Sequence, residues 1–324
     1  MIRRTFIAVC CAAPLAALAQ QKAARDMPRI GFMGLATAQA NASPLDAFRA
    51  GLREHGYAEG KDIIVEYRWA EGRYDRLGAL ASELVNLKPR LIVTQGTDGT
   101  RAAKLATPTI PIVMVGVSDP TVTGLVDNIA RPSGNVTGLI FLTAELNSKR
   151  LELLSQALPQ RRKFAALVNP DNTSHPPILR AVESTAKALG LELQKFEARR
   201  PDDFGTAFSA MVAARVDGVV VLDDGMFNGN LAELGRQAVK TRLPTAGVVE
   251  LIDAGALMAY GVNRAAMYRR VAWYIDRILK GAKPADLSIE RATNYDLVVN
   301  RKIAQQLDIR LPQELLMRAD RVIE

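Results

Sequence analysis

Short apolar runs alternate along the chain with longer stretches whose apolar residues recur every three or four positions. Runs of this length are typical of strands buried in a parallel sheet, whereas the three-to-four spacing is typical of a helix with one buried face. We interpret as strands residues 29–33, 62–69, 91–94, 110–115, 164–169, 191–197, 216–222, 245–249 and 257–260. We interpret as helices residues 74–87, 147–158, 178–189, 201–214, 231–241 and 265–280, with two more starting at about 43 and 97. This alternation predicts an α/β fold with parallel sheets.

The stretch from 91 to 138 contains two apolar strands that each end in a small polar loop. Residues 95–100 read QGTDGT and residues 116–120 read GVSDP. Either Thr97 or Asp98 could be the N-cap of the helix that follows the first loop. In open α/β sheets, ligands bind beyond the carboxyl ends of the strands. The stretch therefore predicts one half of a ligand cleft.

The two halves of the chain share this plan, although no residue-level repeat joins them. Each half begins with a strand that ends in a small polar loop and continues as alternating helices and strands. A break rich in proline and glycine near 131–141 is where we expect the first crossing between two lobes.

Composition and charge are typical of a globular protein and argue against a nucleic-acid partner. The 324 residues are 48% hydrophobic and 23% charged, and the net charge is +8. Such a length suffices for two lobes of ordinary size. The basic residues are scattered among acidic ones, without the basic stripe typical of nucleic-acid binding. We interpret the excess charge as a solvated surface.

The N-terminus predicts export. Arg3 and Arg4 precede a short apolar run that ends in an A-x-A-like site, which is typical of a secretory signal peptide spanning residues 1–19. Lipidation of Cys10 or Cys11 is the alternative, but neither lies in a good lipobox. Both cysteines of the chain lie here, so the mature protein would have no thiol, and no later stretch is long and apolar enough to span a bilayer.

Six blocks of the sequence resemble the substrate-binding proteins of a bacterial ABC importer family that includes tryptophan-type uptake systems. The blocks are RIGF (29–32), AFRAGL (47–52), EYRWAEG (66–72), ARPSGNVTG (130–138), KRLELL (149–154) and ILKGAKPADL (278–287). The resemblance covers essentially the whole mature chain. It departs at residues 245–250, TAGVVE, where relatives are more aromatic.

The resemblance implies a type I periplasmic-binding-protein fold, with two doubly wound parallel-sheet lobes joined by three crossing strands. The N-terminal lobe would comprise residues 27–138 and 261–292, and the C-terminal lobe residues 139–260 and 293–324. It implies a monomeric periplasmic protein that binds a small molecule between the lobes and delivers it to a membrane permease. We expect an amino acid or another small carboxylate, with aromatic amino acids included.

In the N-terminal lobe, the candidate ligand-binding residues are Thr37, Gly96, Thr97, Ser118 and Asp119, which follow three predicted strands. Thr97 and the N–H groups near Gly96 could hold a carboxylate, because helix starts attract anions. Thr97 could equally cap its own helix, and Thr37 could serve only its turn. Asp119 could bind a ligand ammonium, but a cap on a helix after Pro120 is the stronger interpretation.

In the C-terminal lobe, the candidates are Asn169, Asp223 and Tyr260, which end predicted strands. Asp223 directly follows a continuous apolar strand, whereas Asp224 fits an ordinary turn better. Tyr260 could line the pocket or pack in the hinge. Phe227 could stack on an aromatic ligand or anchor its loop. We expect Thr97→Ala and Asp223→Ala to weaken ligand binding without much loss of fold.

The sequence contains no motif that indicates an enzyme. The only histidines are His55 and His175, and there is no HExxH, G-x-S-x-G, P-loop or G-x-G-x-x-G motif. We therefore expect no catalytic residue, no cofactor and no metal. One alternative function has the same fold and cleft: an exported sensory module that signals to a membrane receptor. A neighbouring gene for a sensor kinase, instead of permease and ATPase genes, would favour it.

Overall fold

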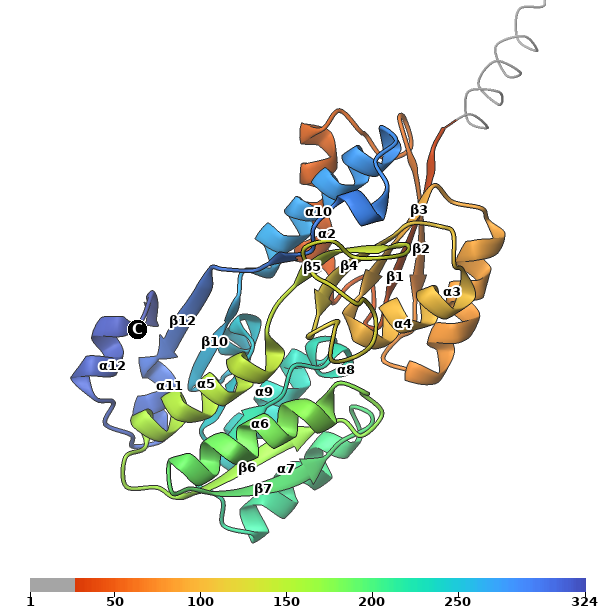
Figure 1. The fold of residues 1–324 in the computed structure, drawn as a ribbon. Helices are drawn as coiled ribbons and strands as arrows, with labels where there is room; N and C mark the ends of the chain where they lie inside the picture. The colour runs from red at the N-terminus through yellow and green to blue at the C-terminus, as the bar shows by residue number, and fades with distance from the viewer. Residues whose placement is uncertain (1–26) are drawn as a thin grey trace, which may run out of the picture.

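The computed structural model describes residues 27–324, which fold into two lobes, each built on its own sheet (Figure 1). The predicted signal peptide, with Cys10 and Cys11, lies outside the described residues. The first sheet has the strand order β11-β5-β4-β3-β1-β2. Its strands are β1 (Arg29–Gly34), β2 (Ile64–Trp69), β3 (Leu91–Gln95), β4 (Ile112–Val117), β5 (Val136–Ile140) and β11 (Glu290–Arg291), and all their pairings are parallel.

Helices cover both faces of this sheet because successive strand residues point to opposite sides. On one face, Ile30 and Phe32 of β1 pack in a core with α2 (Ala42–Glu54) and α10 (Arg264–Leu279). On the other, Met33 joins a core with α3 (Leu77–Asn86) and α4 (Gly96–Ala106). Gly51 lets α2 approach α10 closely, since a Cβ there would stand 2.4 Å from the Arg269 carbonyl oxygen.

The second sheet has the order β13-β12-β10-β9-β8-β6-β7. Its strands are β6 (Lys163–Val168), β7 (Glu192–Glu197), β8 (Gly218–Val221), β9 (Thr245–Gly247), β10 (Met258–Val262), β12 (Tyr295–Asn300) and β13 (Arg321–Ile323). Among the described strands, only β10 and β12 pair antiparallel. The remaining elements are α5 (Thr143–Ala157), α6 (His175–Ala188), α7 (Asp203–Ala213), α8 (Gly225–Asn228), α9 (Leu231–Thr241), α11 (Arg301–Gln306), α12 (Gln313–Arg318) and the 3₁₀ turns η1 (Tyr74–Arg76), η2 (Val249–Ala254) and η3 (Pro284–Asp286).

The chain passes between the lobes three times. It leaves the first sheet after β5 and enters α5 of the second lobe, returns from β10 into α10, and leaves again between β11 and β12. The predicted α/β architecture of two doubly wound lobes with three crossings is thus confirmed. The lobe boundaries predicted from the sequence stay a prediction. None of the described helices is both long and apolar enough to cross a membrane.

The helix predicted to start at about residue 43 is confirmed as α2, which begins at Ala42 with Asn41 at its N-cap position. One local prediction is wrong. No helix follows Pro120, where the chain makes turns instead. Residues 293–324, to which the sequence pattern assigned no element, contribute two strands to the second sheet.

Candidate ligand-binding cleft

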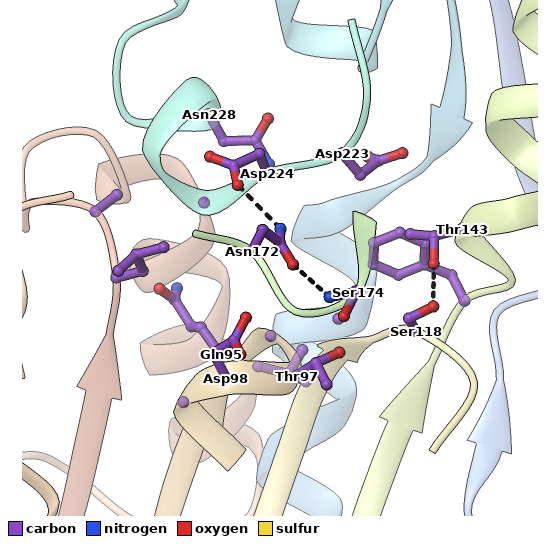
Figure 2. Close-up of a pocket in the computed structure, with 18 of the residues that line it drawn as sticks. Gln95, Thr97, Asp98, Ser118, Thr143, Asn172, Ser174, Asp223, Asp224 and Asn228 are labelled. Atoms are coloured by element: carbon purple, nitrogen blue, oxygen red, sulfur yellow. Dashed lines mark hydrogen bonds between the residues drawn. The ribbon is translucent and has the colours of Figure 1, made fainter. Parts of the chain in front are cut away.

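A cavity of about 110 Å³ lies between the lobes, where strands of both sheets end. Its walls come from residues 35–36 after β1, 95–99 at the end of β3, Val115, Gly116 and Ser118 at the end of β4 and 223–225 after β8, with further residues from α6 and α10. A single buried water needs roughly 10–15 Å³, so this space suits a larger solute. Figure 2 shows polar side chains from both lobes facing one another across it.

Helix α4 begins in the wall of the cavity. Gly96 is its first residue and has a φ of 69°, a conformation that costs glycine little. Gln95 holds the N-cap position, but no side chain caps the first turn. The prediction that Thr97 or Asp98 is the N-cap is therefore wrong, because both lie inside the helix. The first N–H groups remain available to an anion.

Gln95 instead organises a polar cluster beside α10. Its amide nitrogen donates to Asn41 Oδ1 at 2.9 Å and to the hydroxyl of Tyr268. Arg264, one helical turn before Tyr268, also lines the cavity. Burial would lower the pKa of Arg264, but Glu250 at 3.7 Å and Tyr268 together raise it. The cluster therefore places a permanent positive charge at the cavity wall.

The end of β4 contributes Ser118 but not Asp119. Ser118 lines the cavity and accepts a hydrogen bond of 2.5 Å from Thr143 at the start of α5. The carboxylate of Asp119 accepts from the backbone N–H groups of Thr121, at 2.9 Å, and Val122, at 3.2 Å, so it stabilises its own turn. Thr37 is exposed, and its hydroxyl accepts a hydrogen bond from the N–H of Ala40 in its own turn.

Asp223 lines the cavity, yet its charge already has a partner. Arg150 Nη1 donates to Asp223 Oδ2 at 2.6 Å, and Asn147 donates to the same oxygen at 2.9 Å. The side chains of Arg150 and Asp223 are only 1% and 8% exposed. A buried guanidinium requires such a partner, because an unpaired charge away from water is costly. Asp223 is thus part of the structure of the lobe as well as of the cavity wall.

Asp224 and Asn169 form a second buried network behind the wall. Asp224 Oδ1 accepts from the N–H groups of Met226 and Phe227, at 2.8 and 3.0 Å, and so caps α8. The Asn169 N–H donates to His175 Nδ1 at 2.8 Å. His175 Nε2 must then carry the proton that it donates to the Asp223 carbonyl at 3.1 Å. Asn169 is wholly buried and does not line the cavity.

Ser174 is the exception on this wall, because its hydroxyl lacks a partner. It holds the N-cap position of α6 without making a side-chain capping bond. The residue is 4% exposed and lines the cavity. Its Oγ is buried, with no hydrogen-bond partner among residues 27–324. Buried polar groups are nearly always paired, so this hydroxyl is available to a water or a solute in the cavity.

The aromatic candidates from the sequence lie elsewhere. Tyr260 packs in the hinge, with its ring 5.9 Å from that of Tyr295, and its carbonyl accepts from Arg150 Nε. Phe227 is fully buried and packs edge-on against Phe204, which confirms the loop-anchor interpretation.

The structure therefore divides the predicted site residues evenly. Those that line the cavity are Gly96, Thr97, Ser118 and Asp223, and those that do not are Thr37, Asp119, Asn169 and Tyr260. The sequence analysis missed Gln95, Ser174, Arg264 and Tyr268. Two of these had a signal: Ser174 directly precedes a helix with proline in its first turn, and Arg264 follows the end of a strand.

Comparison with known proteins agrees with this architecture. Residues 37–323 match the model of a family described as ABC transporter substrate binding protein. A curated relative, the tyrosine-binding protein of Clostridioides difficile strain R20291, is 24% identical over 264 residues, covering 81% of this chain and 75% of the relative.

Two solved structures share the fold over 92% of this chain and all of theirs. One is a conserved domain protein from Vibrio cholerae O1 biovar El Tor, with a TM-score of 0.85 and 26% identity. The other is an ABC domain from Streptococcus pneumonia in complex with L-Trp, with a TM-score of 0.84 and 22% identity. Both match over the two lobes together, so the paired-lobe arrangement is shared.

Proposed function

The chain belongs to the ABC transporter substrate binding protein family, and from this premise we propose that it captures an aromatic amino acid between its lobes and delivers it to an importer's permease. The family consists of binding proteins and not enzymes, as the sequence predicted, and the fold is of the periplasmic-binding type I class. Export by the N-terminal signal and a place in the periplasm are part of the proposal.

The unpartnered hydroxyl of Ser174 is the observation that carries the proposal. Ser174 begins α6 in one lobe, and Thr97 lies in the first turn of α4 in the other. Both residues line the same cavity, and no side chain caps either helix start. The two hydroxyls, together with the free N–H groups at the start of α4, suit a carboxylate, which accepts several hydrogen bonds. At α6 only the Ser174 hydroxyl contributes, because Pro176 and Pro177 in its first turn have no N–H.

The charges around the cavity favour a ligand that also carries an ammonium group. Arg150 neutralises Asp223, and Arg264 faces Glu250. Asp98 lines the cavity without an ion-pair partner among the described residues. A negative charge left over at a low-dielectric site attracts a cation. The combination fits a zwitterion better than a dicarboxylate.

The remaining wall suits an aromatic side chain. Leu35, Leu77, Phe141 and Ile178 line the cavity together with Tyr74. A mostly apolar wall with a few convergent polar groups is the usual form of a small-molecule site. The tyrosine-binding relative and the structure in complex with L-Trp support this ligand class.

Calorimetry with matched ligands tests the proposal. We expect L-tyrosine or L-tryptophan to bind, and expect at least about a tenfold loss for an analogue without the ammonium or without the carboxylate, since each removes a charge-assisted contact. 3-(4-Hydroxyphenyl)propionate and tyramine are these analogues. Absence of binding by every aromatic amino acid would contradict the ligand class. Uptake of labelled ligand by cells with and without the gene tests the delivery step.

A further inference from the structure

One side of the cleft carries direct contacts between the lobes that the ligand-binding account leaves unexplained. Here α8 of the second lobe meets two loops of the first, residues 35–36 and residues 70–74. A Cβ at Gly225 would stand 2.7 Å from the side chain of Leu35, and one at Gly72 would stand 3.1 Å from Met226. The lobes are therefore packed tightly at this point, protein against protein.

Tyr74 is the main side chain in this contact. Its hydroxyl donates to Asp224 Oδ2 at 2.5 Å, across 150 positions of sequence. Its ring packs against the apolar core of the first lobe around Leu77 and also against the core of the second lobe around Phe227. Burial and the neighbouring Asp224 raise the pKa of Tyr74 well above its usual range, so the hydroxyl stays a donor.

Asp224 is held in place from within its own lobe. Met226 and Phe227 donate to Oδ1, and Asn172 donates to Oδ2 at 2.9 Å. These bonds do not depend on the first lobe, so the acceptor for Tyr74 keeps its position when the lobes separate. A preorganised acceptor of this kind strengthens the bond that completes it.

We propose that Tyr74 is a closing latch, which keeps a measurable fraction of the chains closed before ligand binds. The latch joins protein to protein, so it contributes equally whatever occupies the cavity. This inference rests on the proposed function to the extent that the lobes open and close around a ligand.

The latch has a quantitative consequence for affinity. The apparent dissociation constant equals the intrinsic constant of the closed form divided by the closed fraction. A change that acts only on the latch must therefore weaken ligand binding by the same factor by which it reduces the closed fraction. A change in a ligand contact weakens binding without any such match.

Spin labels on the two lobes measure the closed fraction without ligand. Ser82 of α3 and Ser209 of α7 are exposed, and Figure 1 shows α3 in one lobe and α7 in the other. Ser82 and Ser209 would be replaced by cysteine, in a chain that also carries Cys10→Ser and Cys11→Ser so that the labels attach only there. For Tyr74→Phe we expect the ratio of open to closed forms to rise about tenfold, because a hydrogen bond to a carboxylate is lost.

Tyr57→Phe is the matched control. It also removes a tyrosine-to-aspartate bond, from Tyr57 to Asp276 at 3.1 Å, but both residues lie in the first lobe. We expect it to leave the distance distribution unchanged. Coinciding distributions for the wild type and Tyr74→Phe would overturn the latch.

Affinity then separates the latch from the proposed function. A rise in dissociation constant larger than the loss of closed fraction would make Tyr74 a ligand contact and also overturn the latch. If no amino acid binds, the proposed function fails, while the label distances still decide whether the latch exists.

Discussion

The two walls of the cleft use the ends of their strands in different ways. In the first lobe, Gly96, Thr97 and Ser118 present helix N–H groups and hydroxyls to the cavity. In the second lobe, the strand-end carboxylates are largely used inside the lobe: Asp223 pairs with Arg150, and Asp224 caps α8. The position of a polar residue at a strand end therefore does not tell whether its polar group is available to a ligand.

The difference follows from the cost of burying charge. A buried carboxylate or guanidinium needs a partner in the fold. A hydroxyl or a helix N–H that lacks a partner until a ligand binds costs less folding free energy. Ser174 shows the second case on the second wall, since its hydroxyl is the wall's buried polar atom without a described partner. Mutations on the two walls should therefore affect different properties.

The largest effect should come from Asp223→Ala, on stability. Removing Asp223 leaves Arg150 buried and unpaired, which typically costs about 3–5 kcal/mol of folding free energy. This revises the expectation from sequence that the variant would keep its fold. Denaturant unfolding measures the change.

Two controls sharpen this result. Arg150→Met combined with Asp223→Leu removes both charges and should cost less than the single change. Asp75→Ala breaks the exposed pair with Arg73 and should leave the free energy of unfolding nearly unchanged, because water screens the pair. If Asp223→Ala were no more harmful than Asp75→Ala, the assignment of Asp223 as a structural partner would be wrong.

An intermediate effect should come from Ser174→Ala and Thr97→Ala, on affinity. Each removes a hydroxyl proposed to contact the ligand carboxylate, so we expect about a five- to thirtyfold weaker dissociation constant. The free energy of unfolding should be unchanged in Thr97→Ala. It should rise slightly in Ser174→Ala, because this change removes an unpaired buried group. Calorimetry and thermal unfolding on the same samples test both points. Unchanged affinity in both variants would place the ligand elsewhere.

The smallest effect should come from pH, through Asp98. Thr173 of the second lobe donates to Asp98 Oδ1 at 2.6 Å. Burial raises the pKa of Asp98, and the charge of Asp224 adds to the rise, while the bonds from Thr173 and the charge of Arg101 oppose it. A carboxyl that holds its proton more tightly when the lobes are closed takes up a proton on closure. Closure without ligand should therefore strengthen as the pH falls from neutral toward about 4, the usual carboxyl range. Affinity for a ligand with an ammonium group should instead weaken over this range, because protonated Asp98 no longer attracts the ammonium.

The change should not exceed about tenfold in affinity per pH unit, since one proton is involved. Ligand titrations at several pH values, compared with Asp98→Asn, isolate this contribution from those of the other carboxyls. A pH dependence that is equally steep in Asp98→Asn would show that another group is responsible.

The α/β architecture of this protein could be predicted from the pattern of its residues. Alternating buried runs and amphipathic stretches predict parallel sheets covered by helices, because each face of an element must find a buried partner. The same pattern located the strand ends, and four of the eight predicted residues line the cavity, among them Gly96 and Thr97.

Which of these polar groups face the cavity depends on the tertiary structure. Arg150 meets Asp223 across 73 positions, and Tyr74 meets Asp224 across 150. Periodicity is a local property that reports which face is buried, whereas the pairing of charges and hydrogen bonds depends on residues that only the folded chain brings together.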